Sequence, residues 1–445
     1  MKRIPESHWK YIYIALTINL VLRVILFFAV YPDDKVLRME DQHEYITLAE
    51  TIAKSGFDEN FGTGRTPFYP LFLFICFKFT NSLFFPIIIQ HLTGMFSIIL
   101  CYLSGLFFSE RIALAALFWS AFSFNSIILS NYILTDALYY LTFCMIFMLT
   151  IRYSAQDSRL SDAALSGILI GVSILNRPVS IYLPICFVFF FFARHRKNFR
   201  KAFFHSSIFL LSVILLVLPW LARNKQIYGS YALTNFGHYQ LISWIIPGVM
   251  MGSQNISYLE AQKISSEEWE KEKSNLSSEI KKNPFEIDRI GKTYALKKLW
   301  SFPLKRLIIA WTWGAARNMF TPEVIELSHL MNWKWSRFAQ AKGENYFEKS
   351  WNFLFKNENS WYSVFFCLGC IYVLLLRIIQ LFGILTMTKQ HPLLSVFFLI
   401  SIAYFLVLMG PYGSPKYRLP FELLLILYSA FGTERLMSYY KKTLT

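Results

Sequence analysis

The chain has 445 residues, of which 55% are hydrophobic, 18% aromatic and only 16% charged. A soluble domain carries about 25% charged residues, so this composition excludes a soluble globular protein and predicts a polytopic membrane protein. The formal net charge of +16 does not indicate a nucleic-acid partner, because many basic residues stand in short loops between apolar runs. That placement is typical of loops retained on the cytoplasmic side of a membrane.

The N-terminal part of the chain predicts an outward-facing acidic loop. Residues 1–10 are basic, and residues 9–31 are apolar and long enough to span, so we expect a cytoplasmic N-terminus and no cleavable signal peptide. The following segment, residues 39–70, has more acids than bases. Residues 66–80 are apolar but too few to cross a core of about 30 Å easily, so we expect an interfacial or half-inserted helix there.

The remaining apolar runs predict an all-α bundle of about 10–12 transmembrane helices. We expect spans at residues 83–108, 112–130, 133–151, 163–175, 179–193, 203–222, 361–385, 392–409 and 419–436. Residues 256–282 predict a charged surface helix, and residues 303–320 predict either a span or a second interfacial helix.

This pattern predicts three units. They are an N-terminal transmembrane module (1–222) with a first outer loop (32–83), an outer loop with a surface helix (223–302), and a C-terminal transmembrane module (303–445) with a second outer segment (321–360). The basic run between residues 194 and 201 then falls on the inner side, as the positive-inside rule requires.

The cysteines and histidines give little support for a metal site. The six cysteines, including the CxxC pair Cys367 and Cys370, lie in apolar runs and predict packing rather than metal or redox chemistry. His43, Glu44 and His238 are the candidate ligands if a divalent metal binds, but no zinc-like spacing occurs.

Asp41 is the first candidate for a catalytic role. Tyr45 and Ala49 follow it at helical spacing, and Gly56 is a typical residue just beyond a helix C-terminus. Asp41 therefore stands near the N-terminus of a short helix. A simple helix cap explains its position equally well.

Asp136 is a second acid at the outer membrane edge. It follows Thr135 at the start of a predicted span, where a helix-start carboxylate is again the plain interpretation. Its expected placement on the same side as Asp41 favours a shared site.

Several basic residues also stand at the outer membrane edges, the side where basic residues are less expected. Each alone fits an interfacial anchor. Together they suit an anion at the membrane surface, because the arginine guanidinium matches the geometry of phosphate. They are Arg65, Arg177, Arg223, Lys416 and Arg418.

A succession of motifs resembles the membrane-integral GT-C glycosyltransferases, in the branch of the protein O-mannosyltransferases and the lipid A aminoarabinose transferase. The chain has DxxxYxxLAxxxxxxG (Asp41 to Gly56), RTPFYPLFLF, LTDALYYL, LNRP, LPWLARNKQIYG and PKYRLPFELLL in order. Together these motifs cover nearly the whole chain.

The resemblance implies an inverting transfer of a sugar from a polyprenyl-phosphate donor, at the outer face of a bacterial inner membrane, to a lipid, glycan or protein hydroxyl. Asp41 would be the general base, with Glu40, Glu44 and Asp136 as supporting acids. The five basic residues named above would bind the donor phosphate, and membrane lipids would surround the lipid tail. Substrate contacts are expected from Tyr45, Asn224, His238 and Tyr417.

The match has departures and leaves alternatives. The aminoarabinose branch has a Lys-Pro-Pro-like segment where this chain has Arg65-Thr66-Pro67, and Glu40-Asp41 stands for the acidic pair of the mannosyltransferases. The absence of an inserted sugar-binding domain argues against a eukaryotic protein mannosyltransferase. An O-antigen polymerase or ligase would use a diphosphate-linked donor. A lipid or small-molecule transporter is less favoured, because inverted repeats and midplane charges are not evident.

Overall fold

The computed structural model describes residues 4–30, 41–254, 256–334, 346–356 and 360–444. The described residues form helices joined by turns and loops, and they contain no β-strand. The predicted all-α polytopic fold is therefore confirmed.

Six described helices are long and apolar enough to cross a membrane. Their exposed side chains are large and apolar, as a lipid-facing surface requires, for example Ile25 and Leu215. They are α1 (Trp9–Val30), α5 (Phe84–Leu106), α8 (Asp136–Ala155), α11 (Phe199–Tyr228), α20 (Ser360–Gln390) and α21 (Pro392–Met409). The larger predicted number of spans stays a prediction for the other helices.

Shorter helices complete the bundle. The helix α4 (Phe68–Phe79) has 12 residues, a length of about 18 Å, which is too short to cross a bilayer core. The other short helices are α6 (Glu110–Ala121), α7 (Phe124–Leu129), α9 (Leu160–Asn176) and α10 (Leu183–Arg194). The helix α22 (Glu422–Leu444) has 23 residues but is not among the six candidate spans. The predicted single span over 112–130 is wrong in detail, because α6 ends at Ala121 and α7 begins separately at Phe124.

The bundle core is rich in aromatic rings that interlock between helices. Phe143 of α8 meets Phe405 of α21 edge-to-face at 5.3 Å, and Phe187 of α10 meets Phe397 in the same way at 5.0 Å. Such pairs fill the space between helices in preferred geometries.

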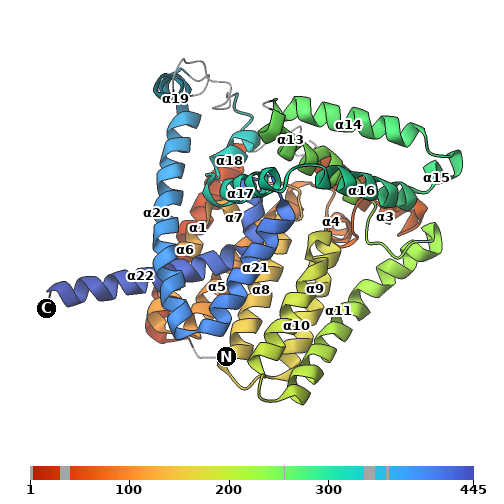
Figure 1. The fold of residues 1–445 in the computed structure, drawn as a ribbon. Helices are drawn as coiled ribbons and strands as arrows, with labels where there is room; N and C mark the ends of the chain where they lie inside the picture. The colour runs from red at the N-terminus through yellow and green to blue at the C-terminus, as the bar shows by residue number, and fades with distance from the viewer. Residues whose placement is uncertain (1–3, 31–40, 255, 335–345, 357–359, 445) are drawn as a thin grey trace.

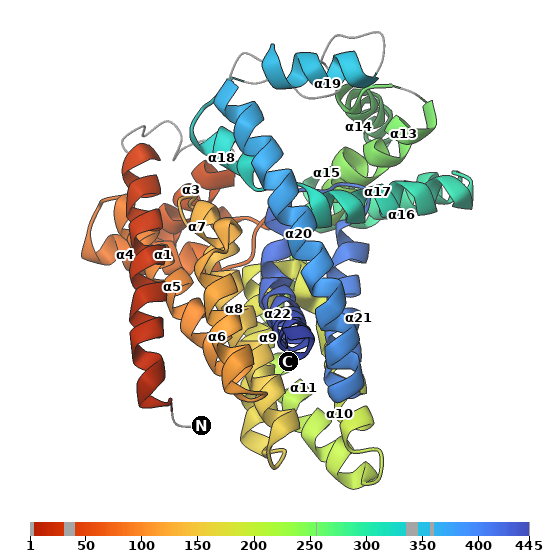
Figure 2. The same ribbon diagram turned by 90° about the vertical axis from the view of Figure 1, so that its left-hand side faces the viewer.

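A layer of short helices covers one end of the bundle (Figure 1). It contains α12 (Gly237–Gln240), α13 (Ile246–Gln254), α14 (Tyr258–Ser274), α15 (Ser278–Lys282) and α16 (Pro284–Trp300). It is called the polar layer here because α14 to α16 are rich in charged residues. The predicted surface helix over 256–282 is thus two helices, α14 and α15. The helix α17 (Leu304–Phe320) is not among the six candidate spans and lies crosswise to the bundle with α16 (Figure 2), as an interfacial helix would.

The same end carries α3 (Asp41–Ser55), α18 (Val324–Leu330) and α19 (Tyr346–Phe355), whereas the hairpin between α10 and α11 lies at the opposite end (Figures 1 and 2). Arg196, Lys197 and Arg200 are exposed at that hairpin. The two ends of the bundle therefore differ in chemistry: one is polar and layered, and the other is a basic tip.

Candidate functional site

An arginine and two carboxylates join the first loop to α3. Asp41 and Glu44 stand three residues apart on one helical face, and the Arg65 guanidinium bridges them. Its NH2 group lies 2.6 Å from Asp41 Oδ1, and its Nε donates to Glu44 Oε2 at 2.9 Å. The Asp41 side chain remains 53% exposed, whereas that of Arg65 is only 16% exposed. The carboxylate of Asp41 is thus held in place and accessible.

Rings enclose the Arg65 guanidinium from both sides. Its centre lies 5.1 Å from the Tyr45 ring and 5.0 Å from the Phe236 ring, within the range of cation–π attraction. Burial disfavours the charge, but interactions with Tyr45 and Glu44 outweigh that cost and raise the pKa of Arg65. Arg65 therefore stays charged at any physiological pH.

The second ion pair lies where α8 begins and α9 ends. Arg177 NH2 lies 2.5 Å from Asp136 Oδ2, and Arg177 also donates to the Thr135 hydroxyl. The Asp136 side chain is only 1% exposed, and its Oδ1 has no hydrogen-bond partner among the described residues. Asp136 therefore keeps one carboxylate oxygen inside the protein that the described residues do not satisfy.

The two basic residues of the segment Pro415–Phe421 have different surroundings. Arg418 is 1% exposed and donates to the carbonyl oxygens of Asn318, Met319 and Thr321 at 3.1, 3.1 and 2.8 Å, besides its ion pair with Glu323. Lys416 Nζ instead lies 5.5 Å from the Tyr417 ring centre. Within the described part of the chain, no carboxylate lies within ion-pair distance of Lys416.

These groups meet around Tyr45. The Gln42 side chain of α3 accepts the backbone N–H of Ile133 at 2.9 Å, which fixes α3 against the turn that leads to Asp136. Burial raises the pKa of Tyr45, and the charges of Arg65, Arg177, Asp41 and Asp136 all act on it. The charges of Tyr417, Glu326 and Asp136 raise the pKa of Lys416, against the lowering effect of burial. The structure therefore brings together Asp41, Glu44, Tyr45, Arg65, Asp136, Arg177, Lys416 and Tyr417.

Comparisons with known proteins agree with this architecture. Residues 64–222 match the family model described as dolichyl-phosphate-mannose-protein mannosyltransferase. The archaeal oligosaccharyltransferase AglB from Archaeoglobus fulgidus, solved with an inhibitory peptide and a dolichol-phosphate, superimposes with a TM-score of 0.53 at 15% identity. The superposition covers 99% of this chain and 51% of AglB, so the chain spans about half the length of that protein. The chain has the GT-C fold.

Other solved structures of the same kind are more distant. ArnT from Cupriavidus metallidurans, solved with undecaprenyl phosphate, is 13% identical with a TM-score of 0.41, over 97% of the GT-C chain and 78% of ArnT. No curated protein matches the sequence. The predicted GT-C fold is confirmed, and the match of residues 64–222 agrees with the mannosyltransferase side of the predicted branch.

Arg223 does not join the site of the GT-C chain. Its side chain donates to the carbonyl oxygens of Phe57 at 2.9 Å and Gly62 at 3.0 Å, and also to that of Asp58. The guanidinium lies over the Trp220 ring at 4.8 Å. These bonds use Arg223 to hold the loop after α3, so its donors are committed to the protein. Arg418 is committed in the same way.

Two other predicted contacts have structural partners. Asn224 is fully buried and donates to the carbonyl oxygen of Ala232 at 2.8 Å. His238 Nδ1 lies 3.0 Å from Asp288 Oδ1 and packs the polar layer together. Glu40 lies outside the described residues, and His43 is exposed on α3. Among the described residues, no group of three metal-capable side chains occurs.

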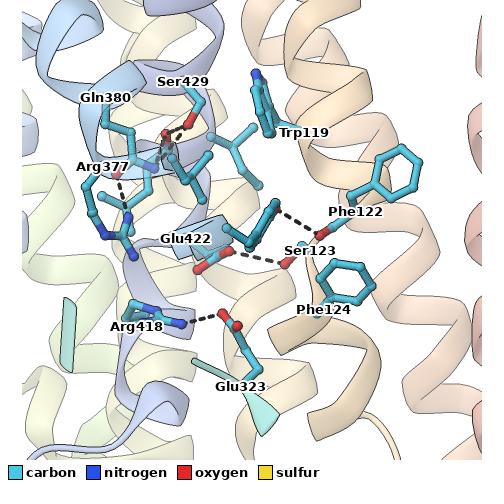
Figure 3. Close-up of a pocket in the computed structure, with 14 residues that line it drawn as sticks. Trp119, Phe122, Ser123, Phe124, Glu323, Arg377, Gln380, Arg418, Glu422 and Ser429 are labelled. Atoms are coloured by element: carbon cyan, nitrogen blue, oxygen red, sulfur yellow. Dashed lines mark hydrogen bonds and ion pairs between the residues drawn. The ribbon is translucent and has the colours of Figure 1, made fainter. Parts of the chain in front are cut away.

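A polar cluster behind Arg418 was not anticipated from the sequence. Figure 3 shows Arg418 pointing at Glu323, Glu422 meeting Ser123, and Arg377 meeting Gln380 around one cavity. The cavity holds about 20 Å³, which is room for a single water molecule. Its residues brace the turn that carries Lys416.

Arg23 was also missed. It lies in α1 with 2% exposure and donates to Asn19, Ser126 and Ser130 at 2.6, 2.9 and 2.9 Å. His91 Nδ1 lies 3.1 Å from its NH1 group. An ionisable residue inside an apolar span is itself the signal that could have found it.

Proposed function

We propose that this GT-C chain transfers a sugar from a polyprenyl-phosphate-linked donor to a hydroxyl group. One observation carries the proposal: an exposed carboxylate held by an arginine stands at the same end of the bundle as a lysine without a carboxylate partner among the described residues. A base for the acceptor and a cation for the leaving phosphate are the two groups that this reaction needs. The match to the mannosyltransferase model and the dolichol-phosphate in AglB support the donor class.

The proposed step is a single in-line displacement. Asp41 takes the proton of the acceptor hydroxyl, the hydroxyl oxygen bonds to the anomeric carbon, and the bond from that carbon to the phosphate oxygen breaks. The polyprenyl phosphate leaves with both electrons of that bond, and the anomeric carbon is inverted. Lys416 stabilises the charge that grows on the leaving phosphate. Arg65 orients Asp41, and Asp136 fixes Arg177 beside the same centre.

The site is proposed to face the outside of a bacterial inner membrane. The basic tip formed by Arg196, Lys197 and Arg200 lies at the opposite end of the bundle, and basic tips are retained in the cytoplasm. Acceptors on that outer face include envelope lipids, glycans and protein hydroxyls. A divalent metal is not required by the step as written, because Lys416 supplies the positive charge.

The test measures sugar transfer by the purified chain in lipid nanodiscs. Envelope lipids, glycans and protein are supplied as acceptors, and mass spectrometry identifies which of them gains a sugar. Undecaprenyl phosphate carrying a range of radiolabelled hexoses and pentoses serves as donor. Asp41→Asn should lower the rate about 10²–10⁴-fold without unfolding the chain. Glu50→Gln, an exposed acid on the same helix, is the matched control.

Two results would contradict the proposal. Transfer that persists at the wild-type rate in Asp41→Asn would remove Asp41 from the mechanism. Transfer only from diphosphate-linked donors would instead support the polymerase or ligase alternative.

A further inference from the structure

Four aromatic rings form a continuous cluster between Lys416 and the polar layer. Trp244 meets Tyr412 edge-to-face at 4.8 Å, and Tyr412 meets Tyr417 at 5.9 Å. Tyr258 of α14 lies 6.2 Å from Tyr412, and Lys416 lies over Tyr417. None of the four rings is fully buried or fully exposed. The cluster thus combines a fixed internal geometry with partly open ring faces.

The backbone around the cluster is held firmly. Trp244 lies on a π-helical turn, Leu241–Ile245, and such turns occur frequently at functional sites. Pro411, next to Tyr412, packs closely on Gly248. A β-carbon added to Gly248 would lie 2.7 Å from the Pro411 side chain. The Tyr258 hydroxyl donates to the carbonyl oxygen of Ser243 at 3.1 Å. These contacts preorganise the rings before any ligand arrives.

The place of the cluster beside Lys416 identifies its occupant. This step rests on the proposed function: if Lys416 holds the donor phosphate, the sugar bonded to that phosphate must lie within one sugar-ring length of the ammonium group. Tyr417 lies at that distance, since Lys416 Nζ is 5.5 Å from its ring centre, and Tyr412 and Trp244 extend the aromatic surface from it. A sugar ring has apolar C–H faces and polar edges, which match half-buried rings that also carry hydroxyl and indole N–H groups.

We propose that Trp244, Tyr412 and Tyr417 form the subsite for the donor sugar. The rings receive the C–H face of the sugar beside the phosphate that Lys416 holds. The subsite therefore raises affinity for the sugar-loaded lipid above that for the lipid phosphate alone. Core packing alone would give no such difference between the two lipids.

The test compares two ligands in the full-length chain in nanodiscs. The probes are undecaprenyl phosphate and a panel of undecaprenyl phosphates loaded with glucose, galactose, mannose or aminoarabinose. We expect at least one loaded lipid to bind the wild type more tightly than the bare lipid. Trp244→Leu should weaken that loaded lipid about 3- to 10-fold and leave the bare lipid unchanged.

Two further variants separate the roles. Trp244→Phe keeps a ring and should restore most of the lost affinity, and Trp300→Leu replaces an exposed tryptophan of α16 as the matched control. If Trp244→Leu lowers the affinity for the bare and the loaded lipid equally, the ring has a structural role and the subsite proposal is wrong. A wild type that binds the bare lipid but no loaded lipid more tightly would also overturn it. Failure to bind any of these lipids would overturn the proposed function as well.

Discussion

Replacing Arg418 by methionine is expected to destabilise the fold rather than weaken donor binding specifically. The Arg418 side chain is 1% exposed, and its guanidinium holds three backbone carbonyl oxygens where α17 ends, besides the Glu323 carboxylate. Methionine fills a similar volume but leaves the carboxylate without its cation. Breaking a buried ion pair from one side costs about 3–5 kcal/mol, which is the expected loss in the free energy of unfolding.

The assay is denaturant unfolding in detergent, followed by tryptophan fluorescence. Arg418→Lys keeps the charge but cannot reach all the acceptors, so its loss should be smaller than that of Arg418→Met. The double variant Glu323→Leu with Arg418→Met removes both charges of this pair, leaves Arg377 and Glu422 together in the same cavity, and should recover part of the stability. Each variant that still folds is then tested for donor binding.

A specific result would refute this reasoning. If Arg418→Met unfolds within about 1 kcal/mol of the wild type yet loses donor affinity, Arg418 contacts the phosphate and the structural assignment is wrong. If adding Glu323→Leu does not restore stability to the Arg418→Met variant, the broken ion pair with Glu323 is not the cause of the destabilisation.

Two further predictions concern other parts of the fold. Gly383→Ala should cost about 1–3 kcal/mol in denaturant unfolding, because the new β-carbon would overlap the Tyr428 carbonyl oxygen of α22, whereas Leu375→Ala on the exposed face of α20 should cost less. Burial raises the pKa of Asp288, but hydrogen bonds from His238 and Lys292 outweigh it and lower that pKa below its usual value. The carboxylate therefore stabilises the polar layer above about pH 4, and this stabilisation is lost as the pH falls through the lowered pKa. Asp288→Asn should be less stable at pH 7 and less sensitive to acid, as measured by unfolding at pH 7 and pH 3; an unchanged acid sensitivity would contradict the assignment.

The short-range features of the chain were predictable. Gly56 was expected to end α3, and it does so with a φ of 73° and an N–H bonded to the carbonyl oxygen of Ile52 at 3.1 Å. The limited length of α4 follows from its short apolar run. Both features depend on residues that are close together in the sequence, so a sequence pattern can predict them.

The partners of the basic residues were not predictable. All five outer bases looked equivalent in the sequence, yet Arg223 and Arg418 bind backbone carbonyl oxygens from segments about 100 residues away or more. Lys416 and Arg418 stand two residues apart, yet only the Arg418 side chain is hydrogen-bonded to carbonyl oxygens among the described residues. Only the tertiary fold decides which basic side chain is held by carbonyl groups of the protein.

The Arg23 network in α1 also constrains how the chain is made. An arginine inside a helix core costs about 2.5–3.5 kcal/mol when the helix enters a bilayer alone. Its hydroxyl partners Ser126 and Ser130 follow 103 and 107 residues later. During synthesis, the Arg23 guanidinium of α1 therefore lacks these hydrogen-bond partners until α5 and α7 have been translated. The contacts that hold α1 at Arg23 can therefore be completed only after residue 130 has been synthesised.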